Sequence, residues 1–145
     1  MDDIRLITSP ANWDISDEEV VILINGKNLA LHFEGLINGI PPEVAFFPST
    51  HLLGKPHPWY HISGKPILYV CGNCGMTGCI CVTVRITIGE DTVTWSDFDR
   101  LAGVGSRHKE NYSDMAYVFQ RTQYEKELSG QYKMSNKMLL DVLSW

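Results

Sequence analysis

The chain has 145 residues, of which 44% are hydrophobic and 20% are charged, and its formal net charge is -5. These values predict one globular domain over residues 1–145, and they argue against disorder and against nucleic-acid binding, which needs clustered Lys and Arg. No apolar run approaches the ~20 residues of a membrane helix, and Met1-Asp2-Asp3 lacks the basic start of a signal peptide, so we expect a cytoplasmic protein with reduced thiols.

The N-terminal segment combines turn-forming residues with acidic ones. We expect residues 1–19 to be an irregular lead-in because Pro10 and Asn12 interrupt regular structure. The acidic residues of this segment are Asp14, Asp17, Glu18 and Glu19. The continuous apolar run at residues 20–24 predicts a buried strand, and the Asn25-Gly26 dipeptide after it predicts a tight turn.

Residues 28–37 fit two periodicities. Leu29, Leu31 and Phe33 alternate as in a strand, whereas Asn28 could cap a short helix that places Leu29 and Phe33 on one side. We favour the short helix. Residues 43–65 are predicted to be rich in loops, with one helical turn at 49–54 that ends at a glycine.

The centre of the chain predicts a β-meander. Apolar and β-branched runs at 66–71 and 79–88 flank a loop that is rich in glycine and cysteine, and a third strand at 92–96 places Val93 and Trp95 on one face. We expect residues 97–100 to leave the sheet and residues 102–114 to form an exposed loop. Large aromatic side chains favour the core, and those expected there are Trp59, Tyr60, Trp95 and Phe98.

The C-terminal part predicts a strand at 116–119, a helix at 121–128 and a last helix that begins at Ser135. In the first helix, Tyr124 and Leu128 share the buried face, while Arg121 and Glu125 form an i, i+4 pair on the surface. The predicted fold class is therefore α+β: an antiparallel β-sheet, built as a meander, with one or two C-terminal helices packed on it.

The four cysteines lie close together in the sequence as Cys71-x2-Cys74 and Cys79-x-Cys81. Four thiolates could bind zinc, and His57 or His61 could replace one of them. Two alternatives stay open: buried thiols that pack as small hydrophobic groups, and a redox pair at the CxxC. We expect no cofactor, with zinc on these cysteines as the alternative.

Several short motifs resemble those of a family of small uncharacterised bacterial proteins. They are Ile24-Asn25-Gly26, Leu52-Leu53-Gly54, the VCGxCGxxGC pattern of residues 70–79, the TVTWSDF segment of residues 92–98 and the FxRxQYE segment of residues 119–125. The resemblance implies no activity. In its small size and acidic character, the chain is also similar to immunity proteins of toxin systems.

The negative net charge predicts a basic protein partner. The carboxylates expected to bind it are Glu90, Asp91, Asp97 and Asp99, which lie at a turn and after the third strand. We therefore expect a non-enzymatic, cytoplasmic binding protein, an immunity protein that occludes a bacterial toxin domain such as those of contact-dependent growth inhibition. The alternative is a zinc-binding or thiol-dependent protein that uses the cysteine hairpin.

Overall fold

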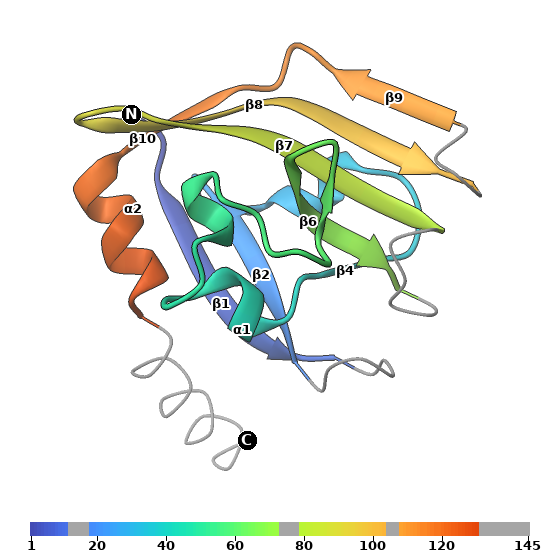
Figure 1. The fold of residues 1–145 in the computed structure, drawn as a ribbon, viewed down its shortest axis with the longest axis horizontal. Coiled ribbons are helices and arrows are strands. Elements are labelled where there is room, and N and C mark those ends of the chain that lie inside the picture. Colours follow the sequence, from blue (N-terminus) through green and yellow to red (C-terminus); the bar gives the residue numbers. More distant parts are fainter. Residues whose placement is uncertain (12–17, 73–78, 104–107, 131–145) are drawn as a thin grey trace.

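The computed structural model describes residues 1–11, 18–72, 79–103 and 108–130 (Figure 1). The first half contains β1 (Ile4–Pro10), β2 (Glu18–Ile24), β3 (Lys27–Asn28), η1 (Leu29–His32), β4 (Ile37–Gly39), α1 (Pro42–Ala45), η2 (His51–Leu53) and β5 (His61–Ile62). The second half contains β6 (Lys65–Cys71), β7 (Ile80–Ile88), β8 (Thr92–Ala102), β9 (His108–Tyr112), β10 (Tyr117–Gln120) and α2 (Arg121–Leu128).

The larger sheet has seven strands, and every strand pair in it is antiparallel. Its strands follow the order β10-β8-β7-β6-β4, with β5 on β6 and β9 on β8. The predicted meander is β6, β7 and β8, and α2 packs beside it (Figure 1). The α+β class is therefore confirmed. No described helix is long and apolar enough to cross a membrane.

The smaller sheet has the order β1-β2-β3. It confirms the predicted turn at residues 25–26 and contradicts the predicted irregular lead-in. Asn25 and Gly26 both have positive φ, 54° and 79°, which matches the tight turn expected between β2 and β3. The irregular lead-in is wrong, because residues 4–10 form β1 and pair with all of β2. Ile4 and Leu6 are fully buried, so the segment has the alternation of a half-buried strand.

The two sheets approach each other where β2 meets β4. The Val20 amide donates to the Ile40 carbonyl at 2.9 Å. A Cβ atom on Gly39 would lie 1.9 Å from the Val20 carbonyl oxygen, so this contact requires glycine. The core fills the space between the sheets, with Val20 and Ile22 on one side and Val93 and Trp95 on the other.

Side chains of α2 form hydrogen bonds with backbone groups of β1. The Leu6 amide donates to Glu127 Oε1 at 2.9 Å, and Gln123 Nε2 donates to the Ile4 carbonyl at 2.6 Å. These side chains occupy backbone groups of β1 that would otherwise lack partners. In Figure 1, α2 stands beside β1, so the first and last described elements are neighbours.

The aromatic core confirms the predicted packing of Trp95 and Val93 against α2. Trp95 and Tyr124 are fully buried, their rings meet edge to face at 6.1 Å, and the indole N–H donates to the Tyr124 hydroxyl at 3.1 Å. Tyr124 in turn donates to the Leu52 carbonyl. The helix at 121–128 is confirmed at both ends, and so is its surface pair, with Arg121 Nε 2.9 Å from Glu125 Oε1.

The third strand is longer than predicted. Arg85 pairs with Ser96, but Thr83 pairs with Asp99, so one extra residue is inserted in β8. Asp97 has φ 53°, and this β-bulge lets the strand continue to Ala102. The prediction that residues 97–100 leave the sheet is therefore wrong. Within 102–114, residues 108–112 form β9 on β8, where a loop was expected.

The short helical predictions have mixed outcomes. Asn28 caps η1 as expected, since its side chain accepts from the Ala30 amide, but the helix ends at His32 and residues 37–39 belong to a strand. The turn at 49–54 contains η2 and ends at Gly54, with φ 85°. The helix predicted from Ser135 and the acidic residues Asp14 and Asp17 lie outside the described residues.

Candidate functional site

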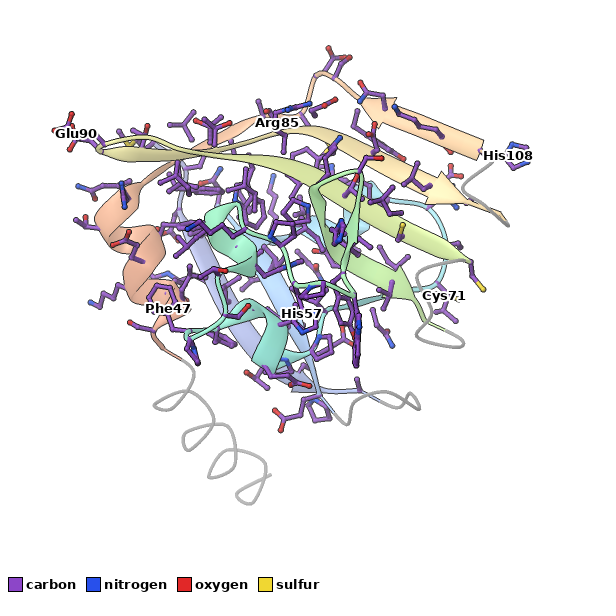
Figure 2. The ribbon with its side chains drawn as sticks, in the orientation of Figure 1. Phe47, His57, Cys71, Arg85, Glu90 and His108 are labelled. Carbon is purple, nitrogen blue, oxygen red and sulfur yellow. The ribbon has the colours of Figure 1, made fainter. Side chains whose placement is uncertain are left out.

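The four predicted partner-binding carboxylates lie in two places. Glu90 and Asp91 are exposed at the turn between β7 and β8, and Figure 2 shows Glu90 at one extreme of this hairpin. Asp97 lies on β8, six residues after Asp91, and at about 3.3 Å per residue the two are about 20 Å apart. The structure therefore brings Asp97 and Asp99 together but separates them from Glu90 and Asp91.

Asp97 and Asp99 belong to a network of internal contacts. Lys65 Nζ lies 2.7 Å from Asp99 Oδ2 and also donates to the Asp97 carbonyl at 2.7 Å. Asn111 Nδ2 donates to one oxygen of each carboxylate, at 2.8 and 2.7 Å. The hydrogen bonds from Asn111 and Lys65 lower the pKa of Asp97 to about 2. Asp99 is only 5% exposed, and through it the network joins β6, β8 and β9.

A cleft of about 390 Å³ opens beside this network. Its lining residues are Gly54, Ser63, Gly64, Lys65, Pro66, Arg85, Ile86, Asp97, Asp99 and Lys109. Arg85 Nη2 lies 3.2 Å from Asp97 Oδ2, and Lys109 Nζ lies 3.8 Å from Asp99 Oδ2. Each cation at this cleft is thus already opposite a carboxylate.

Trp59 was expected in the core, and this prediction is wrong because its side chain is 81% exposed. It lies on the segment of residues 55–60, hereafter the Trp59 ridge. Two prolines, Pro56 and Pro58, fix φ on either side of His57. Tyr60, at the end of the ridge, is 8% exposed and enters the core as predicted.

Buried His51 supports the Trp59 ridge. Its Nδ1 accepts from the His57 amide at 2.9 Å, and its Nε2 lies 2.8 Å from the Ile67 carbonyl, to which it donates. His57 then continues the chain of bonds, because its Nδ1 accepts from the Trp59 amide at 3.2 Å. Burial lowers the pKa of His51 to about 4, so the ring is neutral at pH 7 and keeps this tautomer.

A larger cleft, of about 610 Å³, is lined in part by residues of the Trp59 ridge. Its lining residues are Glu43, Phe47, Pro48, Ser49, Thr50, Lys55, Pro56, His57 and Pro58. Phe47 and His57 are labelled in Figure 2, on the segments that carry its two walls. The smaller cleft is bounded by residue 54 and by 63–66, which flank the ridge in sequence. The Trp59 ridge thus forms part of the larger cleft, and its neighbours in sequence line the smaller one.

The cysteines occupy different environments. Cys71 and Cys81 are buried, Cys79 is exposed, and Cys74 lies outside the described residues. Val70 pairs with Cys81, so these two side chains share one face of the sheet, and Cys71 points to the opposite face. Burial raises the pKa of Cys81 to about 11.

Within the ranges that the structure describes, no three His, Cys, Asp or Glu side chains are arranged to hold a metal ion. Because Cys74 is outside those ranges, zinc on the cysteine hairpin stays a prediction. Near-stoichiometric zinc in purified protein would support it, since folded zinc sites retain their metal.

The exposed tryptophan is the functional candidate that sequence reasoning missed. A signal was present, because Pro-His-Pro-Trp places the indole next to two residues that prevent regular secondary structure.

Comparison of the chain with protein-family models, with curated proteins and with solved structures finds no match. The site is therefore judged on its own geometry.

Proposed function

We propose that this chain is a non-catalytic protein-binding protein, whose partner is a basic toxin domain that it neutralises by occlusion. The observation that carries the proposal is the 81% exposure of Trp59 on a braced segment. Tryptophan is enriched among the residues that dominate binding energy at protein interfaces. Its exposure in the free chain leaves a large apolar surface available to a partner.

Rigidity makes Trp59 a better anchor. Immobilising a flexible side chain at an interface costs roughly 0.5–1.5 kcal/mol. Two prolines and the hydrogen bonds that the His51 and His57 rings accept already restrict the Trp59 backbone, and the His57 ring meets the indole edge to face at 5.9 Å. The backbone of this segment therefore needs little further ordering when the partner arrives.

The charge of the chain supports a basic partner. The formal net charge is -5, and Glu90 and Asp91 are exposed at a hairpin end. Complementary charge raises association rates and selects partners more than it raises affinity. Asp97 and Asp99 contribute less to such a surface, because Lys65 and Asn111 already contact them. The acidic character is also what links the chain to immunity proteins of bacterial toxin systems.

The test begins with the genes beside this one, where the proposal expects a basic toxin domain, and absence of such a domain would count against it. Growth rescue is then measured in cells that express that domain, together with a pull-down of it. Trp59→Ala should abolish rescue and weaken binding at least about tenfold, as expected for an anchor residue. Leu31→Ala is the matched control, since Leu31 is 82% exposed on a different element, η1. It should rescue like the wild type.

The salt dependence of the association rate distinguishes the contribution of the acidic charges from that of Trp59. Reversing Glu90 and Asp91 to Lys should slow association, and added salt should slow wild-type association through screening over about 8 Å at physiological ionic strength. Lack of rescue by well-folded wild-type protein would show the proposed function to be wrong, whereas full rescue by Trp59→Ala would show that Trp59 is not the anchor. In the first case the cysteine hairpin would become the leading candidate site.

A further inference from the structure

The backbone of the Trp59 ridge has no hydrogen-bond donor to offer a ligand. The Lys55 amide donates to the Thr50 carbonyl at 3.2 Å, and the His57 amide donates to His51 Nδ1. The Trp59 amide donates to His57 Nδ1, and the Tyr60 amide donates to the His57 carbonyl at 3.0 Å. The two remaining positions are prolines, which have no N–H. A ligand strand therefore cannot pair with this segment as in a β-sheet.

Side chains supply the available donors instead. Within the described residues, the Trp59 indole N–H, the His57 Nε2–H and the Lys55 ammonium have no hydrogen-bond acceptor. All three side chains belong to the ridge, and Lys55 and His57 also line the larger cleft. Such donors suit a ligand that presents backbone carbonyls rather than backbone N–H groups.

The walls of the larger cleft restrict the ligand further. Phe47, Pro48, Pro56 and Pro58 give apolar ring surfaces on both sides of a space of about 610 Å³. Glu43 also lines the cleft, and it is exposed and forms no ion pair with a described cationic residue. The cleft thus combines apolar rings, side-chain donors and one available carboxylate.

We propose that the Trp59 ridge and the larger cleft bind an extended, proline-rich segment of the partner, with a Lys or Arg of that segment opposite Glu43. A polyproline II segment has no internal hydrogen bonds and leaves its carbonyls available, and its rings pack in aromatic-lined grooves. Indole and imidazole donors meet those carbonyls, and the apolar walls meet the proline rings. The inference rests on the proposed function, because it specifies what the partner inserts at the same surface.

The experiment uses the full chain and three capped heptapeptides: APPRPPA, the proline-free AAARAAA, and the uncharged APPQPPA. Amide and indole N–H signals are followed by two-dimensional NMR, and the Trp59 indole peak is identified as the one missing in Trp59→Phe. We expect APPRPPA to shift this peak in a saturable manner, with weaker binding of APPQPPA and no saturation by AAARAAA.

Two variants and one control assign the contacts. Trp59→Ala should weaken APPRPPA binding about tenfold or more, and Leu31→Ala should leave it unchanged. Glu43→Gln should reduce APPRPPA binding to the level of APPQPPA and leave APPQPPA unaffected. If AAARAAA binds as well as APPRPPA, or if the Trp59 peak does not move with either proline peptide, the inference is wrong.

The failures of the two proposals are distinguishable. Peptide binding without growth rescue would reject the toxin partner and keep the ligand class. Rescue that depends on Trp59, without any response to the proline peptides, would keep the protein-binding function and reject the proline-rich ligand.

Discussion

Neutral, buried His51 should make the stability of this protein fall in mild acid. Its pKa is lowered from 6.5 to about 4, mainly because burial penalises the charged ring. Between these values the unfolded chain takes up a proton and the folded chain does not. The stabilisation is therefore complete above the unfolded pKa and is lost as the pH falls toward the folded pKa.

The size of the effect follows from the gap between the two pKa values. At about 1.4 kcal/mol per pKa unit, the gap between 6.5 and about 4 corresponds to roughly 3 kcal/mol of unfolding free energy. Protonation would also place a hydrogen on Nδ1, the atom that accepts from the His57 amide. The loss should therefore include release of the Trp59 ridge.

The assay is urea unfolding from about pH 7 to pH 4, for wild type and for His51→Gln, which can still donate to the Ile67 carbonyl but does not titrate. The difference between the two unfolding free energies at each pH cancels the contribution of every group that titrates alike in both proteins. One is Glu19, whose pKa burial raises, so that it favours the folded state toward acid. Wild type should lose roughly 3 kcal/mol more than the variant over this range. Equal pH dependence in the two proteins would refute the buried, neutral state of His51.

Three further predictions concern stability and reactivity. Lys65→Met leaves the buried Asp99 carboxylate without its closest cation, so the unfolding free energy should fall by about 3–5 kcal/mol; a loss below ~1 kcal/mol would show that solvent reaches Asp99. Trp95→Ala should cost about 3–5 kcal/mol in the same assay, because the indole is fully buried, and a loss below ~1 kcal/mol would contradict this. Cys81 should react with iodoacetamide far more slowly than exposed Cys79, since the raised pKa of Cys81, about 11, leaves little thiolate at pH 8; equal rates by peptide mass mapping would refute the burial.

Local patterns predicted the elements that local chemistry determines. The strands on either side of the cysteine loop follow from β-branched runs, and α2 follows from the i, i+4 positions of Tyr124 and Leu128. Strand β1 was missed because two buried residues, Ile4 and Leu6, are a weak alternation that Pro10 obscures. The continuation of β8 was missed because the aspartates at 97 and 99 are typical of a turn, whereas a β-bulge at Asp97, with φ 53°, lets the strand continue.

The candidate site depends on contacts that are distant in sequence. Lys65 meets Asp99 across 34 residues, and no local pattern pairs them. Trp59 was placed wrongly for a different reason. A large aromatic residue is expected in the core, and only the path of the loop shows that this one is exposed. The proline spacing around Trp59 indicated a loop, but the exposure of its side chain depends on where buried His51 holds that loop.

The contacts between β1 and α2 have a consequence for synthesis on the ribosome. Chains emerge from the N-terminus at about 5–20 residues per second, yet the Leu6 amide finds its acceptor at Glu127, 121 positions later. The smaller sheet can form its turn early, but its outer strand waits for the last helix. This part of the fold should thus be completed only after residue 127 has left the ribosome, and a nascent chain that stalls before that residue would leave an unpaired strand edge, which is a template for aggregation.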